Sequence, residues 1–179
     1  FTGEARNGQT LTVPLVGSFF GTGFNPAVDR LRNHSDADQN VRLNVGDGMT
    51  TLDPNLAYAM GDPNFGKDPS VVGTGYTNND NNPNTLTELY AIDARQDVLV
   101  ELENPNDGQL TTVGGLGVRT NDLVGFDVIR QQRIAYASLT IQGRHEGSTL
   151  YRVNLDTGNA RRVGDIGNRV PLVSIAVWP

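Results

Sequence analysis

Three arginines in the first third of the chain are the residues best suited to chemistry. Arg30, Arg32 and Arg42 fall on two adjacent expected strands. If their side chains share one face of a sheet, their guanidinium groups can hold an anion or a carboxylate through paired hydrogen bonds. The alternative is that the arginines form ion pairs with acids that are close in the sequence. Those acids are Asp29, Asp36 and Asp38.

A second group of candidate ligands is an asparagine-rich stretch over residues 78–84. Asp80 lies within it, and carboxylate and amide oxygens are the ligands that calcium prefers. The stretch does not match the twelve-residue loop of an EF-hand, so an ordinary solvated turn is the alternative. Calcium at Asp80 is therefore a possible cofactor, and the sequence predicts no other.

Histidine and cysteine chemistry is sparse. The chain has two histidines, His34 and His145, and no cysteine, which excludes disulfides and thiolate metal sites. Both histidines stand in polar, turn-like surroundings and are predicted to be solvated loop residues. A metal enzyme of the superoxide dismutase kind needs several histidines close together, so the sequence does not support one. No catalytic residue is predicted.

The charge and hydropathy of the chain disfavour two classes of partner. Its net charge is −6, with 20 acidic and 14 basic residues, which repels the phosphate backbone of nucleic acids. No apolar run approaches the roughly 20 residues that a membrane-spanning helix requires. The sequence therefore predicts neither nucleic-acid binding nor a membrane-spanning segment.

The elements that must position these residues are short strands. Glycine, proline, asparagine and aspartate mark frequent turns. Between the turns, segments such as residues 150–155 alternate apolar and polar side chains, which is typical of a half-buried strand. Only Pro54 to Met60 has a spacing that suits a short turn of helix. The sequence therefore predicts an all-β fold.

Two patterns recur at intervals of roughly 50 residues, the length of one propeller blade. A glycine followed by an aromatic residue occurs at Gly23, Gly75 and Gly125. A strand–turn–strand hairpin also recurs: its turn glycines Gly108 and Gly158 are 50 residues apart, and the same hairpin appears earlier at Gly48. The repetition predicts units of about four strands that pack against one another.

The expected fold is a β-propeller-like repeat in a single domain over residues 1–179. It has three full four-stranded blades at about 19–53, 71–114 and 124–164, and terminal strands at 10–16 and 172–178. A β-sandwich is the alternative. Because rings usually need about four or more blades, we expect a fragment of a larger propeller. A small ring closed by the first and last strands is the other possibility.

Several long motifs resemble a known bacterial family, domain of unknown function 4394. They include Gly-Phe-Asn-Pro-Ala-Val-Asp-Arg-Leu-Arg at 23–32, Leu-Tyr-Ala-Ile-Asp at 89–93 and Leu-Tyr-Arg-Val-Asn-Leu-Asp-Thr-Gly at 150–158. The likeness runs from about residue 19 to the C-terminus. It implies an exported protein with no assigned catalytic residue and another blade-like segment upstream. Asn33 and His34 depart from the apolar residues usual in the family, which puts the second strand in doubt.

The function expected from these features is an extracytoplasmic, non-enzymatic binding or scaffolding module with a protein or carbohydrate partner. It would be secreted, periplasmic or on the cell surface. One alternative is a secreted protective or hydrolytic enzyme. The other is a structural subunit of a surface layer or filament, which would self-associate through unpaired strand edges.

Overall fold

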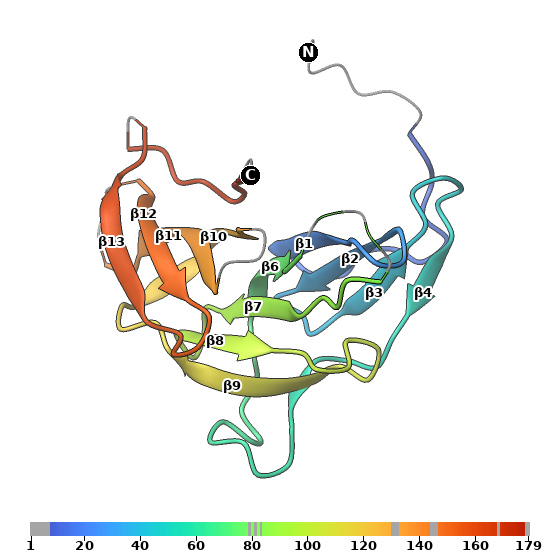
Figure 1. Ribbon diagram of the computed structural model, residues 1–179, viewed down its shortest axis with the longest axis horizontal. Helices are drawn as coiled ribbons and strands as arrows, with labels where there is room; N and C mark the ends of the chain where they lie inside the picture. The colour runs from blue at the N-terminus through green and yellow to red at the C-terminus, as the bar shows by residue number, and fades with distance from the viewer. Residues whose placement is uncertain are drawn as a thin grey trace.

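The protein folds entirely into β-structure in the part of the chain that is described. The computed structural model describes residues 8–78, 80, 82, 84–129, 133–143, 147–167 and 169–177, and these contain thirteen strands and no helix. The strands form three sheets that lie side by side in an arc (Figure 1). Within the described ranges, no helix is long and apolar enough to cross a membrane, in agreement with the sequence.

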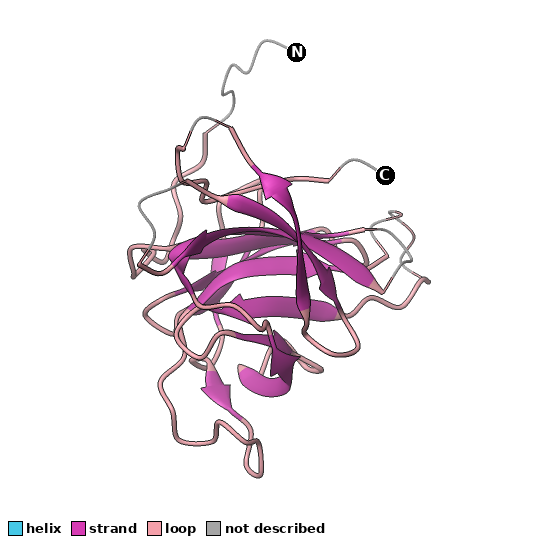
Figure 2. Cartoon of the chain, turned by 90° about the vertical axis from the view of Figure 1, so that its left-hand side faces the viewer, coloured by secondary structure: helices cyan, strands magenta, loops and turns pink. Residues whose placement is uncertain are grey.

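Each sheet is an antiparallel meander of four consecutive strands. The first contains β1 (Phe20–Asn25), β2 (Arg30–Ser35), β3 (Asn40–Leu43) and β4 (Thr50–Leu52). The second contains β6 (Val71–Tyr76), β7 (Leu89–Asp93), β8 (Val98–Glu101) and β9 (Gln109–Gly115), with β5 (Ala57–Tyr58) added in parallel beside β9. The third contains β10 (Thr120–Val128), β11 (Ile134–Ile141), β12 (Thr149–Asn154) and β13 (Ala160–Asp165). Its strong twist is visible in Figure 2.

The last hairpin of each sheet closes with the same kind of turn. Gly48, Gly108 and Gly158 have φ angles of 75°, 71° and 74°, a left-handed conformation that favours glycine. The side chain before each glycine accepts a hydrogen bond from the amide after it. These contacts are Met49 N to Asp47 Oδ1, Gln109 N to Asp107 Oδ1 and Asn159 N to Thr157 Oγ1.

The same three glycines lie against an earlier part of the chain. A Cβ added to Gly158 would lie 2.3 Å from the carbonyl oxygen of Gly114 in β9. One added to Gly108 would lie 2.5 Å from the carbonyl oxygen of Asn55, just after β4, and one added to Gly48 would lie 2.5 Å from that of Thr10. Each turn is therefore seated on the backbone that precedes its own sheet.

The first strands of the three sheets pack face to face, with β6 between β1 and β10. Glycines make this approach possible. A Cβ on Gly21 would lie 2.9 Å from backbone atoms of Gly73, and one on Gly73 would lie 2.8 Å from Phe126 Cβ. A Cβ on Gly125 would lie 2.7 Å from Ile175 N in the C-terminal segment. A larger residue at these positions would force neighbouring strands apart.

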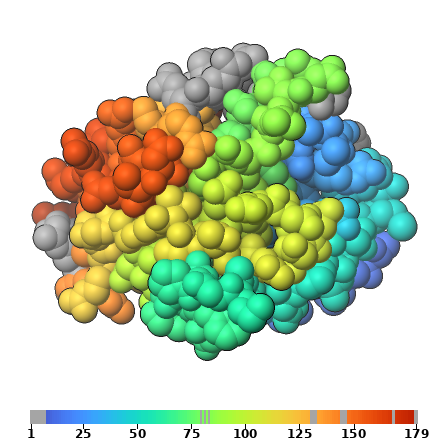
Figure 3. Space-filling model, turned by 60° about the horizontal axis from the view of Figure 1, so that its bottom comes forward, coloured from blue at the N-terminus to red at the C-terminus, as the bar shows by residue number. Residues whose placement is uncertain are grey.

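The main apolar core lies between the second and third sheets. The second sheet contributes Val72, Tyr90, Ile92 and Leu99, and the third contributes Val124, Phe126, Leu139 and Val153, all buried. A smaller cluster covers the opposite face of the second sheet and includes Leu56 and Tyr58 from the β4–β6 connection. Figure 3 shows this connection lying along the outer part of the second sheet.

Two local expectations differ from the structure. Pro54 to Met60 forms no helical turn, because Ala57 and Tyr58 instead extend the second sheet by pairing with Gln109 and Leu110. Residues 10–16 and 172–177 run without a strand ladder. The first segment bonds to the sheet through contacts such as Thr12 N to Gly48 O, and the second through Leu172 N to Ser148 Oγ. Residue 178, the end of the predicted last strand, lies outside the described ranges.

The close approach of β6 and β10 predicts the effect of adding one methyl group. Gly73→Ala places a Cβ 2.8 Å from Phe126 Cβ and 3.0 Å from Val124 Cγ1, so we expect a loss of about 1–3 kcal/mol in the free energy of unfolding. Gly115→Ala in β9 is the control, because a Cβ there meets nothing within 4 Å. Urea unfolding of both variants measures the difference, and equal losses would contradict the packing role of Gly73.

Candidate functional site

The face of the first sheet that is turned toward the second sheet is polar. Arg32 lies opposite Arg42 in the β2–β3 register, and His34 lies opposite Asn40. Side chains at directly paired positions share one face of a sheet, so these four project together. The sheet therefore brings Arg32 and Arg42 together, as an anion site at these arginines requires.

Arg32 is buried at the centre of this face, with 3% of its side chain exposed. Its guanidinium donates hydrogen bonds to five acceptors on four segments of chain. They are Tyr76 Oη at 3.1 Å, Asn40 Oδ1 at 2.6 Å, Asp53 Oδ2 at 3.0 Å, Pro105 O at 3.0 Å and Asn106 Oδ1 at 2.7 Å. Arg32 thus joins the first sheet to β6 and to the β8–β9 hairpin.

Asp53 is the carboxylate that balances this group. It is buried and bonds Arg42 through both oxygens, from Nε at 2.8 Å and Nη2 at 2.8 Å, as well as Arg32. The bidentate pairing raises the pKa of Arg42 above its usual value. One carboxylate is therefore shared by two guanidinium groups, which leaves a local excess of positive charge.

An open pocket of about 350 Å³ lies over this network. We call it the arginine pocket, and it is lined by Asn25, Val28, Arg30, Arg32, Arg42, Tyr76, Pro105 and Asn106. Arg30 is exposed at its rim, and its Nη1 donates to the carbonyl oxygen of Asp29 at 2.9 Å. All three predicted arginines thus reach one pocket.

The three acids named as alternative partners do not fill that role. The side chain of Asp36 accepts the amides of Ser18 and Phe19, and Asp29 contributes only its carbonyl oxygen to Arg30. Asp38 occupies the β2–β3 turn, where burial and the nearby carboxylate of Asp68 raise its pKa to about 6. The expected pairing was wrong because Asp53, at the end of β4, is brought next to Arg42 by the meander.

His34 is a buried strand residue, so its prediction as a solvated loop residue was wrong. It lies on β2 with no exposed surface, and its Nδ1 is 3.0 Å from Thr74 Oγ1 in β6. Burial, with the charge of Arg32, lowers its pKa to about 3, so the imidazole is neutral at physiological pH. β2 also includes Asn33, which resolves the doubt about that strand.

The other candidate ligands do not join the arginine pocket. Asp80 Oδ1 accepts the amide of Asn82 and Asp80 Oδ2 accepts Thr85 Oγ1, so its carboxylate supports its own turn. Calcium binding there stays a prediction. Among the described residues, no three histidines or acids gather as metal ligands. His145 lies outside the described residues.

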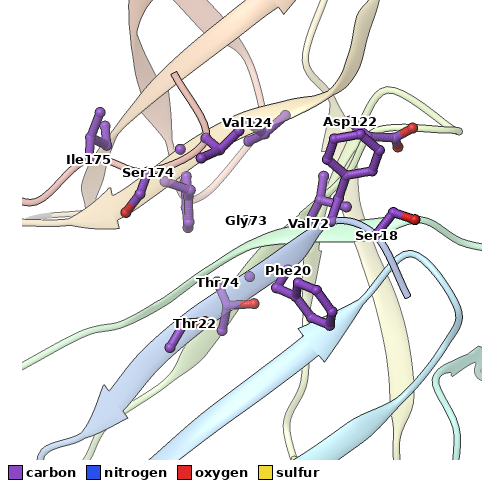
Figure 4. A pocket seen from close by; sticks show the side chains of 15 residues that line it. Ser18, Phe20, Thr22, Val72, Gly73, Thr74, Asp122, Val124, Ser174 and Ile175 are labelled. Atoms are coloured by element: carbon purple, nitrogen blue, oxygen red, sulfur yellow. The ribbon is translucent and has the colours of Figure 1, made fainter. Parts of the chain in front are cut away.

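A second pocket of about 350 Å³ lies where the first strands of the sheets converge, and its lining includes Gly125 and Phe126 of the repeated glycine–aromatic motif. Figure 4 shows its lining, which includes Thr22, Thr74 and Val124 from three different sheets and Ser174 from the C-terminal segment. Among the described residues of this lining only Asp122 is charged, and it accepts a hydrogen bond from Ser70 Oγ at 2.7 Å. The lining is mostly apolar, so the arginine pocket is the better candidate for recognising a charged group.

Apart from its three arginines, the residues of the arginine pocket and its network were not predicted from the sequence, and they include Asp53, Tyr76 and Asn106. In the sequence, Tyr76 stood out only as the aromatic residue after the repeated Gly75. The repeat could have indicated these contacts. When repeated units pack in order, the first strand and the last hairpin turn of each sheet lie against the sheet before it.

The shared carboxylate predicts a large effect of removing its charge. Asp53→Asn leaves Arg32 buried without its counter-charge, so we expect the free energy of unfolding to fall by about 3–5 kcal/mol. Asp156→Asn is the control, since Asp156 pairs with Arg133 in an exposed position and such pairs contribute about 0–1 kcal/mol. Chemical denaturation compares the two, and similar losses would show that the buried network does not stabilise the fold.

The buried imidazole predicts a pH dependence of stability. His34 stays neutral when folded, with a pKa of about 3, but takes up a proton below about pH 6.5 when unfolded, so stability is lost as pH falls from 6.5 toward 3. Between pH 6.5 and 4.5 the wild type should lose about 2 kcal/mol more than His34→Gln, in which this proton uptake is removed. The raised pKa of Asp38 changes stability with pH in the opposite direction, but it does so equally in both proteins and does not affect the difference between them. An NMR titration of His34 with a midpoint near 6.5 would contradict this.

Comparison with known proteins identifies the family. No curated protein matches the chain. The family model described as "Domain of unknown function (DUF4394)" matches residues 1–176, and so includes residues before position 19, where the resemblance in the sequence was first noted. The motifs quoted above lie in the β1–β2 hairpin at 23–32, in β7 at 89–93, and in β12 and the turn after it at 150–158. The chain belongs to this family of domains of unknown function.

Proposed function

We propose that this chain is a non-catalytic binding module that recognises a carboxylate group, carried by a protein or carbohydrate partner, in the arginine pocket. The observation that carries the proposal is the charge balance there: Arg30, Arg32 and Arg42 reach one pocket in which Asp53 is their shared carboxylate. The whole chain has a net charge of −6, so a positive pocket stands out against its surroundings.

The three arginines have different roles in this proposal. Arg32 donates hydrogen bonds to the network from all three of its nitrogens and supplies a fixed positive charge beneath the pocket. Arg42 is held by Asp53 at Nε and Nη2, which leaves Nη1 directed away from that bidentate contact. Arg30 is exposed, and its side chain makes one hydrogen bond among the described residues, to the Asp29 carbonyl oxygen. A ligand carboxylate therefore binds Arg30 and the free edge of Arg42.

Binding fits this lining better than catalysis does. A guanidinium does not lose its proton in a protein, so arginine holds anions but does not act as a general base. Burial raises the pKa of Tyr76, the other titratable lining residue, and so keeps its hydroxyl protonated at neutral pH. The rigid network under the pocket lowers the conformational cost of binding, because Arg32 and Arg42 are already oriented.

The architecture that we propose is an array of propeller-like blades. Two repeated contacts support it. Each last hairpin turn lies on the backbone that precedes its sheet, and each first strand packs through glycine on the next segment along the chain. The sequence resemblance to exported bacterial proteins supports a location outside the cytoplasm. In such arrays the loops at the ends of the strands, including the β8–β9 hairpin at the pocket, are common recognition surfaces.

The test is a calorimetric titration with N-acetylglutamate and with its neutral analogue N-acetylglutamine. We expect the acid alone to bind, and we expect Arg30→Gln and Arg42→Gln each to weaken it about tenfold, because each removes a charge-assisted hydrogen bond. Arg95→Gln removes an exposed arginine that pairs with Asp68, and it is the control for net charge. Equal binding of the amide, or unchanged binding by Arg30→Gln, would refute the proposal.

A further inference from the structure

A second pair of arginines faces outward on the third sheet. Arg152 of β12 lies directly opposite Arg161 of β13, and both side chains are exposed. The opposite face of these strands holds the buried core residues Val153 and Ala160, so the two arginines project away from the second sheet. They line a pocket of about 450 Å³ with Ile134, Asn154, Thr157 and Asn159.

This arginine pair has no counter-charge among the described residues. Like charges at directly opposed strand positions destabilise a sheet. The Arg32–Arg42 pair of the first sheet has the same cross-strand arrangement, but it is balanced by the buried Asp53. No hydrogen bond or ion pair to Arg152 or Arg161 occurs within the described ranges.

The acids of the same hairpin are engaged elsewhere. Asp156 binds Arg133 Nε at 2.8 Å, and Asp165 binds Arg162. Arg162 is paired across the strands with Tyr151, so it belongs to the other face of the sheet from Arg161. The two positive charges of the pocket therefore face solvent together. Two guanidinium groups exposed side by side can hold a carboxylate through paired, charge-assisted hydrogen bonds.

The remaining lining narrows the class of ligand. The amide side chain of Asn159 makes no hydrogen bond among the described residues, so it offers both a donor and an acceptor. Asn154 uses its Oδ1 in the turn, where it accepts Asp156 N and Thr157 N, which leaves its NH₂ group to donate. Ile134 is the apolar residue of the lining, and Tyr136, which pairs with Arg152 on the same face of the sheet beside the pocket, adds a half-buried aromatic residue.

We propose that this surface is a second binding site, specific for an acidic saccharide such as a uronic acid. The guanidinium groups of Arg152 and Arg161 hold the carboxylate, the two asparagines bind hydroxyl groups, and Ile134 and Tyr136 cover the apolar C–H face of the sugar ring. The volume suits one or two sugar residues. The site lies on a different sheet from the arginine pocket and does not depend on the function proposed for that pocket.

The experiment is a titration of the whole chain with digalacturonate, followed by NMR and calorimetry. Digalactose, sulfate and a triglutamate peptide are the comparison probes. We expect digalacturonate to bind and digalactose not to, and we expect Arg152→Gln and Arg161→Gln each to weaken binding about tenfold. Because both side chains are exposed, the variants should fold as the wild type does, which circular dichroism checks.

Two matched variants test whether digalacturonate binds at the Arg152–Arg161 pair. Arg119→Gln removes an exposed arginine just before β10 and should change the dissociation constant less than about twofold, as expected for screened surface charge. Arg30→Gln reports on the arginine pocket, which can also take a carboxylate, and it should leave the NMR shifts that digalacturonate causes in β12 and β13 unchanged.

Three results would overturn the proposal. The first is loss of digalacturonate binding in Arg30→Gln with no change in Arg152→Gln, which would assign the sugar to the arginine pocket. The second is sulfate binding as tightly as digalacturonate, which would show an adventitious ion only. The third is equal binding of triglutamate, which would indicate an acidic peptide. Failure of N-acetylglutamate to bind, in contrast, affects only the arginine pocket.

Discussion

The close approach of backbones at the first strands is the constraint on which the structure depends. Gly21, Gly73 and Gly125 each occupy a position where a Cβ would lie within 3 Å of atoms in a neighbouring segment. Without that approach, β6 could not lie between β1 and β10, and the Arg32 guanidinium could not reach Tyr76. The three glycines, by letting the first strands approach closely, therefore determine which charged side chains lie next to one another.

The two interfaces between sheets bury different kinds of side chain. The second and third sheets share an apolar core, in which the hydrophobic effect favours contact without directional requirements. The first and second sheets share Arg32, Asp53 and His34, whose burial is acceptable only with suitable partners. That requirement fixes the orientation of the first sheet, and it also holds the arginine pocket in one geometry before any ligand arrives.

Much of the fold followed from the sequence because the signals were periodic. The turn glycines at 48, 108 and 158 and the alternation in residues 150–155 correspond to real hairpins. The shared face of Arg32 and Arg42 followed from adjacent strands, whereas Asp53 did not, because its proximity depends on the β3–β4 pairing. His34 was misjudged since a polar neighbourhood in sequence becomes a buried one when another sheet covers it. Pro54 to Met60 shows tertiary pairing overriding local helical preference.

The contrast between the interfaces has a consequence for how the molecule opens. Proteins unfold locally in cooperative units whose free energies differ, and amide hydrogen exchange reports those differences. The apolar contact should keep the second and third sheets together as one slowly exchanging body. The first sheet, joined through a few directional contacts around Arg32, forms a separate unit that exchanges sooner, and mild acid widens the gap because His34 is protonated once it is released.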